Sequence, residues 1–386
     1  MEFDLGEDAL TLKKLTKDFA TREIEPFAAE WSEREEFPAH VFRKLGDLGL
    51  MGTLVEEQYG GVDVGMVPFV AVMEELGQAD QSVAAAWNAH TTIASLPLAR
   101  FGTHDQKERW LRPLAEGRNI GAFGLTEPGA GSDAASIRTR AERRDGGWVI
   151  NGNKIFISNA GTEISLGVSL LAVTGQNDDG SKRYGVFFVP KGTEGYGLSQ
   201  PMRKLGWHAM DTRELSFDDC WVPEDHLIGE EGAGLSQFLS VLDPGRISVA
   251  ALSLSLAQAA LGLALDYVVE RRQFGRRISD FQATQHRLAE MATQVETARW
   301  LVYRAAWLAD SGREYSQAAA MAKLHASEVA NKVASASLQL HGGYGYMRET
   351  PISRFFADAK ILEIGEGTSE IQKNLIARRL LRDTAR

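Results

Sequence analysis

A glutamate between two glycines is the first residue of this sequence whose setting suggests chemistry. Glu366 is followed by Ser369 and, three residues further, by Gln372, a spacing typical of a capping box. It predicts a helix that begins near Glu370, with its free N–H groups turned toward the glycine loop. The glycines let a flat ligand approach the backbone closely. A solvated surface turn has the same composition, so both interpretations stay open at this point.

A second glycine-rich stretch, Leu125-Thr-Glu-Pro-Gly-Ala-Gly-Ser-Asp133, follows a predicted strand. Its backbone N–H groups and the hydroxyls of Thr126 and Ser132 can hold a phosphate or the heteroatoms of a ring. The stretch is not a Walker loop, because no Gly-Lys-Ser/Thr follows, and it lacks the glycine spacing of a Rossmann turn. Taken alone, it is equally well interpreted as a ligand cradle and as a structural turn.

Two further segments place hydrogen-bond donors at predicted helix ends. Gly342 and Gly343, in the segment QLHGGYGY, break a helix and expose backbone donors to which an anion can bind. His341 has no partner in the sequence that indicates a triad, so we expect it to be packed rather than catalytic. The segment ERRQFG, at 270–275, carries two guanidinium groups that either cap carbonyl oxygens or bind a pyrophosphate.

Charge and cysteine content narrow the class of protein. The 386 residues carry 42 basic and 52 acidic side chains, a net charge of −10, which argues against general binding to nucleic acid or to an anionic membrane. Cys220 is the only cysteine, so an intrachain disulfide and a cysteine-based metal cluster are excluded. The acidic N-terminus has no signal-peptide pattern. We therefore expect a cytoplasmic protein without a metal site.

One uncharged segment, Ile247 to Leu265, is nearly long enough to cross a bilayer. Three serines, Gln258 and Gly262 interrupt it. A helix buried between other helices needs apolar surface all round, so we expect a core or subunit-interface helix and no integral membrane association.

Hydrophobic periodicity changes twice along the chain. Residues 1–120 have helical spacing, residues 121–230 contain β-branched and aromatic runs between turns, and residues 231–386 return to helical spacing. We expect an α+β multidomain protein with an N-terminal helical domain, a middle antiparallel β domain and a C-terminal helical domain, divided at these positions. Asp145-Gly146 and Asn151-Gly152 predict two successive hairpins.

The remaining predicted elements follow from the same patterns. Further predicted strands are Ser169–Thr174, Tyr184–Val189 and Glu214–Phe217. The long predicted helices are Arg246–Glu270, Gln282–Ser311, Tyr315–Leu340 and Pro351–Ile364, with a short one after Ser369.

Four motifs together resemble the acyl-CoA dehydrogenase family. LTEPGAGSD, ERRQFG, QLHGGYGY and EGTSEIQ occur in the order and spacing of that family, and the resemblance covers nearly the whole chain. It implies a C-terminal four-helix bundle, FAD as cofactor, an acyl-CoA substrate and electron transfer to an electron-transfer flavoprotein. It also implies a homotetramer built as a dimer of dimers.

The resemblance assigns roles to individual residues. Those expected at the flavin are Phe123, Leu125, Thr126, Gly131, Ser132, Phe156, Ser158, Gln282, Gln339, Gly342, Gly343, Thr368 and Glu370. Those expected to reach the FAD of a neighbouring subunit are Arg271, Gln273 and Phe274. Those expected at the substrate are Ser132, Asp243, Arg246, Trp87, Thr91, Gly365 and Gly367, with Asn88 beside them at the acyl end.

Glu366 matches the catalytic base of the family. It would remove the α-proton of the thioester while its own amide N–H, with a ribityl hydroxyl, binds the thioester oxygen. Exclusion of water by the substrate would raise its pKa toward neutrality. Some members carry the base at the position of Gly245, an alternative that glycine closes, and members acting on glutaryl-CoA have an arginine where an ungapped match puts Ala84. A dicarboxylyl substrate is therefore disfavoured.

Three positions depart from the usual pattern of the family. Gly365 stands where many members have tyrosine, and Phe156 and Ser158 stand where they have tryptophan and threonine. An aromatic face and a hydroxyl are thereby kept, so function should survive. A bulky Trp87 in the acyl pocket would favour short or medium chains, although a tryptophan in the helical core is at least as good an interpretation.

Three other functions are alternatives to a dehydrogenase. An acyl-CoA oxidase that uses O2 would share these residues, but many oxidases carry an additional C-terminal domain. Nitroalkane oxidases have aspartate at the position of Glu366. A non-catalytic scaffold of the same fold would have no reason to keep intact cofactor motifs. The dehydrogenase is therefore the favoured interpretation.

Overall fold

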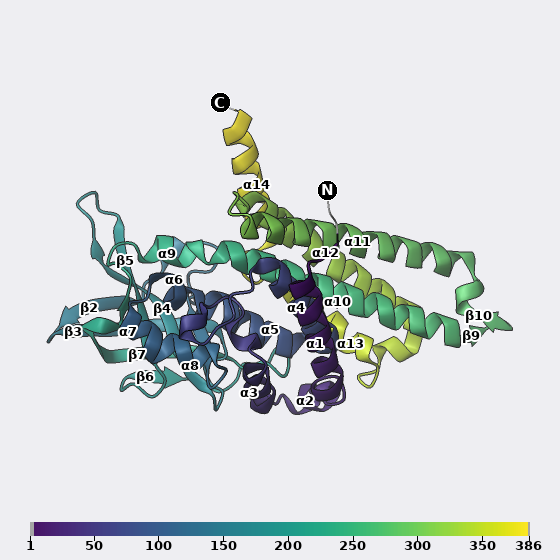
Figure 1. Ribbon diagram of the computed structural model, residues 1–386, viewed down its shortest axis with the longest axis horizontal. Coiled ribbons are helices and arrows are strands. Elements are labelled where there is room, and N and C mark those ends of the chain that lie inside the picture. The colour runs from purple at the N-terminus through teal and green to yellow at the C-terminus, as the bar shows by residue number, and fades with distance from the viewer. Residues whose placement is uncertain (1–3, 385–386) are drawn as a thin grey trace.

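An N-terminal set of helices lies between a β-sheet and a long helical bundle in the computed structural model, which describes residues 4–384 (Figure 1). This arrangement agrees with the expected order of helices, strands and helices. The N-terminal helices are α1 (Glu7–Glu23), α2 (Ala28–Arg34), α3 (Ala39–Asp47), α4 (Met66–Ala79), α5 (Gln81–Ala89), α6 (Leu96–Phe101), α7 (His104–Gln106) and α8 (Arg112–Ala115).

Helix α5 connects the three parts of the molecule. It is buried along its whole length because it packs against α4, the bundle helix α10 (Leu242–Glu270) and strand β1 (Ile120–Gly124). Asp80 caps it by accepting a hydrogen bond from the backbone N–H of Val83 at 2.9 Å. A π-helical turn, His90–Ala94, follows directly. A helix held on all sides is a rigid place from which to present side chains.

The middle of the chain forms an eight-stranded sheet with strand order β6-β7-β3-β2-β4-β5-β8, and β1 pairs with β4. Its two faces carry separate hydrophobic clusters, one of which includes residues of α6, α8 and the bundle helix α9 (Gly234–Ser240). The other strands are β2 (Arg140–Arg144), β3 (Gly147–Ser158), β4 (Ser165–Gln176), β5 (Lys182–Pro190), β6 (Tyr196–Leu198), β7 (Thr212–Pro223) and β8 (Leu227–Ile228).

The sheet is mixed rather than wholly antiparallel as expected. Strand β4 runs parallel to both β1 and β2. The chain reverses direction between β2 and β3 and again between β3 and β4, so β2 and β4 point the same way and pair as parallel neighbours. Sequence patterns predict single strands and their turns, whereas strand neighbours depend on the whole topology.

One of the two predicted hairpins is confirmed and the other is wrong. Asp145 and Gly146, both with positive φ, form the turn between β2 and β3. Asn151-Gly152 instead lies inside β3, where the pairing with β7 shifts register. Gly152 has φ 147°, and a Cβ there would lie 2.7 Å from the Cα of Thr139. This glycine therefore makes a bulge beside a crowded backbone and not a turn.

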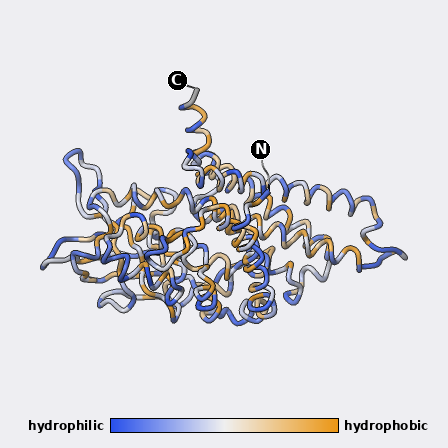
Figure 2. Tube along the Cα trace, viewed as in Figure 1, coloured by the Kyte–Doolittle hydropathy of each residue, from blue (hydrophilic) through white to orange (hydrophobic). Residues whose placement is uncertain are grey.

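The C-terminal part contains α9, α10, α11 (Gln282–Asp310), α12 (Ser316–His341), α13 (Pro351–Ala359) and α14 (Ser369–Thr384). Helices α10, α11 and α12 pack side by side and extend away from the sheet (Figure 1). At their far tip, β9 (Arg272–Gln273) and β10 (Arg276–Arg277) form a small hairpin that is strongly hydrophilic (Figure 2). The predicted helix Pro351–Ile364 ends earlier, at Ala359, and continues as the 3-10 turn Lys360–Glu363.

Helix α10 contains the uncharged segment of the sequence. Together with α9 it is the one helix of residues 4–384 that is long and apolar enough to cross a membrane, and 72% of its apolar window is buried inside the structure. It packs against α4, α11 and α12. The apolar surface is thus covered by protein, as expected of a core helix.

A buried carboxyl group connects the bundle to the sheet domain. Asp358 on α13 accepts a hydrogen bond from the backbone N–H of Trp207 at 2.5 Å. Nearby, Arg354 lies 3.5 Å from Asp80, the cap of α5. Burial raises the pKa of Asp358 to about 7, and the carboxylate of Asp80 acts in the same direction.

Replacing Asp358 by asparagine tests this contact through its pH dependence. Below about pH 7 the folded chain keeps a proton on Asp358, whereas the unfolded chain, with an ordinary pKa near 4, releases it. The stability contributed by this group is therefore lost as pH rises from about 4 through 7. Asparagine can still accept from Trp207 and does not ionise, so the melting temperature of Asp358→Asn should fall less between pH 5 and pH 8 than that of wild type.

Calorimetry at several pH values measures this difference. Asp178→Asn, at an exposed position of the β4–β5 loop, is the matched control and should follow the wild-type curve. Parallel curves for all three proteins would contradict a protonated Asp358.

Candidate active site

Glu366 occupies a strained turn between the 3-10 turn Lys360–Glu363 and α14. Its φ is 51°, in the left-handed region that residues other than glycine rarely adopt, and Gly367 follows with φ 97°. Thr368, not Ser369 as predicted, caps α14, because its hydroxyl accepts from the backbone N–H of Ile371 at 3.4 Å. A non-glycine residue in such a turn often marks a functional site.

The carboxylate of Glu366 is held on one side only. Asn88, at the end of α5, donates from Nδ2 to Oε1 at 3.2 Å. The other oxygen, Oε2, is inaccessible to solvent and has no hydrogen-bond partner among residues 4–384. A buried carboxylate oxygen without a donor is costly to keep, and it is the oxygen that a general base needs.

Gly245 of α10 makes room for this carboxylate. A Cβ at Gly245 would lie 2.4 Å from Oε2 of Glu366 and 3.5 Å from Cγ2 of Ile93. Residues 121 positions apart in the chain therefore meet at one point. The resemblance gives Gly245 as the position of the base in other members of the family. A side chain at either position, 245 or 366, would therefore reach the same space.

Burial and nearby charges set the pKa of Glu366. Burial raises it to about 7, while Lys323 on α12, the hydrogen bond from Asn88 and the guanidinium of Arg246 each lower it. A carboxyl group with a pKa near neutrality is a much stronger base than one at an ordinary value near 4, yet it is still ionised in half of the molecules at pH 7. The site therefore favours proton abstraction at physiological pH.

Asp243 and Arg246 lie one helical turn apart near the start of α10. Nη1 of Arg246 forms an ion pair with Oδ1 of Asp243, which also accepts from the hydroxyl of Ser316 at 3.1 Å. Nε of Arg246 is buried and has no hydrogen-bond partner within residues 4–384. Arg246 is close enough to Glu366 to lower its pKa, and its guanidinium keeps one donor for a ligand.

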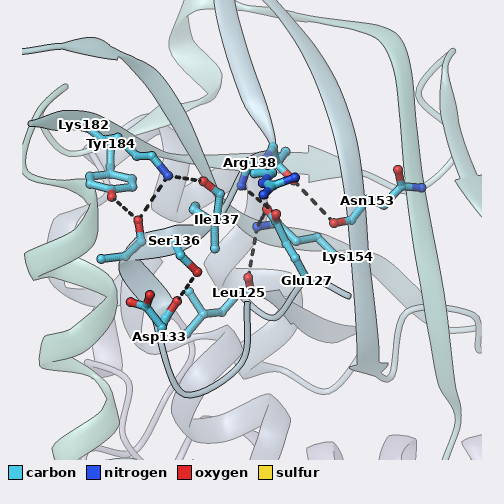
Figure 3. A network of polar contacts seen from close by, with 12 residues as sticks. Leu125, Glu127, Asp133, Ser136, Ile137, Arg138, Asn153, Lys154, Lys182 and Tyr184 are labelled. Atoms are coloured by element: carbon cyan, nitrogen blue, oxygen red, sulfur yellow. Dashed lines mark hydrogen bonds and ion pairs between the residues drawn. The ribbon is translucent and has the colours of Figure 1, made fainter. Parts of the chain in front are cut away.

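The glycine loop after β1 is braced from within the sheet domain (Figure 3). Lys154 is fully buried, and its ammonium donates to Oε1 of Glu127 at 2.8 Å and to the carbonyl of Leu125 at 3.0 Å. Burial lowers the pKa of Lys154 to about 8, against the attraction of Glu127. Glu127 also accepts from the backbone N–H groups of Arg138 and Thr139. The loop is therefore rigid although its outer residues are exposed.

The outer residues of this loop can accommodate a flat ligand. Gly131 and Ser132 are exposed, and a Cβ at Gly129 or Gly131 would meet nothing within 4 Å. Phe156 on β3 is 62% exposed with φ 61°, an unusual conformation for an aromatic residue. An open backbone cradle beside an unburied aromatic ring fits the isoalloxazine of a flavin.

Four more residues expected near the ring lie in β1, in β3 or in the loop: Phe123, Leu125, Thr126 and Ser158. Phe123 stacks on Phe238 with ring centroids 4.2 Å apart. The carbonyl of Thr126 accepts from the N–H of Ile155 at 2.9 Å. Ser158 ends β3 and is half-buried. Thr368 and Glu370 belong to the start of α14, two and four residues after Glu366.

A second group of expected cofactor residues lies at the far tip of the bundle. A cavity of about 470 Å³ is lined there by Arg271, Gln273, Gly342 and Gly343, among others. The Cζ atom of Arg271 lies 5.6 Å from the ring centre of Tyr344. Gln282 and Gln339 are exposed on neighbouring helices, and Phe274 is 93% exposed. An apolar ring so fully exposed suits contact with another molecule.

One chain does not bring the two groups together. The tip with β9 and β10 and the sheet that carries the glycine loop lie at opposite ends of the molecule (Figure 1). Arg271, Gln273 and Phe274 are therefore far from Phe156 and Ser132 of the same chain, in keeping with the expectation that they serve a neighbouring subunit.

Trp87 and Thr91 lie in the core and not at an open pocket. The indole of Trp87 is fully buried, stacks on Phe69 at 4.7 Å and donates from Nε1 to the carbonyl of Leu50 at 2.8 Å. The hydroxyl of Thr91 donates to the carbonyl of Trp87 at 2.9 Å. The core interpretation of Trp87 is thus the one that the structure favours, and this residue no longer carries an argument about chain length.

Sequence reasoning missed two residues that act on Glu366, Asn88 by a hydrogen bond and Lys323 by its charge. Asn88 was expected at the acyl end, but it donates to the carboxylate. Lys323 was not singled out, although a lysine within the alanine-rich run AAAMAKLHA is a signal for a buried cation. A side chain at Gly365 would not be crowded, because a Cβ there would meet only the carbonyl oxygen of Ile361 at 3.5 Å.

Comparisons with known proteins cover the whole of this arrangement. The models for the acyl-CoA dehydrogenase N-terminal, middle and C-terminal domains match residues 6–118, 122–220 and 232–381. A probable acyl-CoA dehydrogenase, YngJ, of Bacillus subtilis is 44% identical over 99% of this chain and 100% of its own.

Two solved structures are similar over the same length. Butyryl-CoA dehydrogenase from Megasphaera elsdenii has a TM-score of 0.95 and 38% identity, covering 99% of this chain and 100% of its own. A structure described as the electron transferring flavoprotein of Acidaminococcus fermentans contains a chain with a TM-score of 0.95 and 39% identity over the same shares.

Gly245→Ala tests whether the base needs the space above α10. The new methyl group would displace the flexible end of Glu366 and no backbone atom, so the fold should be kept. A displacement of about 1 Å can cost about a hundredfold in rate, and we expect flavin reduction by acyl-CoA to slow at least about tenfold. Stopped-flow absorbance measures this rate.

Gly262→Ala is the control on the same helix, since a Cβ there meets nothing within 4 Å. It should reduce its flavin at the wild-type rate. A Gly245→Ala protein as fast as Gly262→Ala would show that the carboxylate does not need this position.

Proposed function

Because the chain belongs to the acyl-CoA dehydrogenase family, we propose that Glu366 is the base that takes the α-proton of an acyl-CoA thioester. The protein is an oxidoreductase that converts an acyl-CoA to its trans-2-enoyl-CoA, binds FAD and passes electrons to an electron-transfer flavoprotein. The unpartnered, buried Oε2 of Glu366, held over Gly245, is the observation that carries the assignment of the base.

The residues around Glu366 each have a part in the proton transfer. Asn88 holds Oε1, so Oε2 is directed into the site. As the α-proton leaves, charge develops on the thioester oxygen, and the amide N–H of Glu366 can donate to it. Bound FAD supplies the acceptor for the hydride that leaves the β-carbon. Burial excludes water, which would otherwise compete as proton donor and weaken each of these contacts.

We further propose a short acyl chain as substrate. The similar solved structure from Megasphaera elsdenii is a butyryl-CoA dehydrogenase. The arginine that members acting on glutaryl-CoA have for a second carboxylate is absent at the matching position, because Ala84 stands there and is buried in α5. Asp243 and Arg246 would contact the CoA arm, and Ser132 would contact it from the glycine loop.

The active protein is proposed to be a homotetramer, a dimer of dimers, in the cytoplasm. Each FAD would lie in the glycine loop of one subunit with Phe156 and Ser158 against its ring. Arg271, Gln273 and Phe274 of a neighbouring subunit would complete the site. This assembly is supported by the separation of the two residue groups in one chain and by the exposure of Phe274.

Anaerobic titration with saturated acyl-CoAs from C4 to C16, followed by flavin bleaching, tests the function. Wild type should bleach, most readily with the short chains. Glu366→Gln keeps the shape of the side chain but cannot take a proton, so it should bind FAD and acyl-CoA while flavin reduction slows about a thousandfold.

The control is Glu349→Gln, which replaces an exposed glutamate in the same C-terminal part of the chain and should behave as wild type. A Glu366→Gln rate above about a tenth of wild type would refute the base assignment. Rapid reoxidation of the reduced flavin by O2 would indicate an oxidase instead of a dehydrogenase.

Arg271→Ala tests the subunit-shared cofactor site. If the guanidinium binds the pyrophosphate of a neighbour's FAD, the variant should lose FAD on gel filtration, seen as a lower ratio of absorbance at 450 nm to absorbance at 280 nm. Arg272→Ala is the control, because Arg272 is the next residue but is not among the residues that line the cavity. Equal FAD content in both variants would remove Arg271 from the site.

A further inference from the structure

Lys323 of α12 is a fully buried lysine without an ion pair among residues 4–384. Its ammonium donates to the carbonyl oxygen of Gly367, the residue after Glu366, at 2.7 Å. No carboxylate of residues 4–384 lies within 4.0 Å of its nitrogen. The other fully buried lysine, Lys154, has its carboxylate partner at 2.8 Å. Burying an unpaired cation destabilises a fold, so the position of Lys323 is better explained by a functional role than by a contribution to stability.

Four charged groups, each from a different part of the surrounding structure, act on Lys323. Glu363 ends the 3-10 turn before the loop, Glu366 lies in the loop, Glu370 belongs to the first turn of α14, and Arg246 comes from α10. Burial lowers the pKa of Lys323 to about 8. The three glutamates oppose this shift, and Glu366 raises the pKa more than Glu363 or Glu370 does. In return, Lys323 is the charged group that most strongly favours the ionised form of Glu366.

The backbone contact of Lys323 falls on the strained part of the loop. Glu366 has φ 51°, and a residue other than glycine keeps this conformation only where surrounding contacts hold it. The carbonyl of Gly367 receives two donors, Nζ of Lys323 at 2.7 Å and Nε2 of Gln372 at 2.9 Å. Gln372 is neutral and comes from the helix after the loop, whereas Lys323 is charged and comes from the bundle core.

We propose that Lys323 is a positioning residue for the base: by binding the Gly367 carbonyl, its ammonium anchors the loop to α12 and places a positive charge behind the carboxylate of Glu366. This inference rests on the proposed function of Glu366. Lys323 touches neither substrate nor cofactor in this role. It acts through the loop and through its charge.

The charge has a definite consequence for the reaction. Glu366 must be ionised before it takes the α-proton and is neutral afterwards, so a cation nearby keeps a larger fraction of the enzyme ready at a given pH. Without Lys323, the pKa of Glu366 rises further above its ordinary value. The active, ionised fraction at neutral pH falls, and the pH profile of flavin reduction moves to higher pH.

Lys323→Met and Gln372→Met separate charge from anchoring. Both variants remove a donor to the same carbonyl oxygen, but only the first removes a charge. The rate of flavin reduction by butyryl-CoA is measured anaerobically by stopped flow from about pH 5.5 to pH 9. For Lys323→Met we expect a rate at pH 7 about fivefold lower and a profile shifted upward by about one unit. Gln372→Met should keep the wild-type midpoint.

Hydrogen–deuterium exchange of the peptide covering 361–372 provides a second readout that does not depend on activity. Exchange at the loop amides should be faster in Lys323→Met than in wild type, because one anchor of the turn is lost. FAD content and melting temperature are measured for every variant. Lys323→Gln, which can donate but carries no charge, serves if Lys323→Met does not retain FAD, and should show the same shift in midpoint.

The outcomes separate this inference from the function on which it rests. If wild type is not reduced by any acyl-CoA, the proposed function fails, and unchanged exchange in Lys323→Met would then also overturn the anchoring role. If wild type is reduced but the Lys323→Met and Lys323→Gln profiles coincide with the wild-type profile, the positioning role is overturned while the function stands. Loss of FAD by both Lys323 variants would assign the residue a purely structural role.

Discussion

The burial of one carboxylate is the constraint around which this structure is arranged. Ionised groups are stable inside proteins only with compensating contacts, and Glu366 has few: a hydrogen bond from Asn88 on one oxygen and none on the other among residues 4–384. Helices α5, α10 and α12 meet at this carboxylate, each with one adaptation to it. Asn88 donates a hydrogen bond, Gly245 leaves space, and Lys323 supplies charge and holds the adjacent carbonyl.

The sheet domain solves a different problem, the display of an exposed loop in a fixed shape. The Glu127–Lys154 pair lies beneath the glycine loop and binds its backbone from the inside (Figure 3). Removing one member of such a buried pair destabilises a protein strongly, whereas the intact pair adds little net stability. The pair is better understood as a means of specifying loop conformation, with the outer face left free for the cofactor.

The proposed division of the cofactor site between distant parts of the chain would connect cofactor binding to assembly. The glycine loop and the bundle tip lie at opposite ends of one molecule (Figure 1), so neither can complete a site for the other within a single chain. The exposed ring of Phe274 is unfavourable as free surface, whereas the hydrophilic hairpin that carries it would be unfavourable in a core. The proposed association of subunits would give both features a function.

Local patterns in the sequence determined much of this protein. The turn at Asp145-Gly146, the long bundle helices and the glycine loop all rest on residues close together in the chain, and the four ordered motifs indicated the family and, through that resemblance, the proposed base Glu366. Tertiary structure alone decided the rest. The mixed sheet, the bulge at Gly152 and the core position of Trp87 depend on neighbours distant in sequence. So do the hydrogen bond from Asn88 to Glu366, the space that Gly245 leaves for it and the hydrogen bond from Lys323 to Gly367, because burial and hydrogen-bond partners arise from packing between elements that no local pattern records.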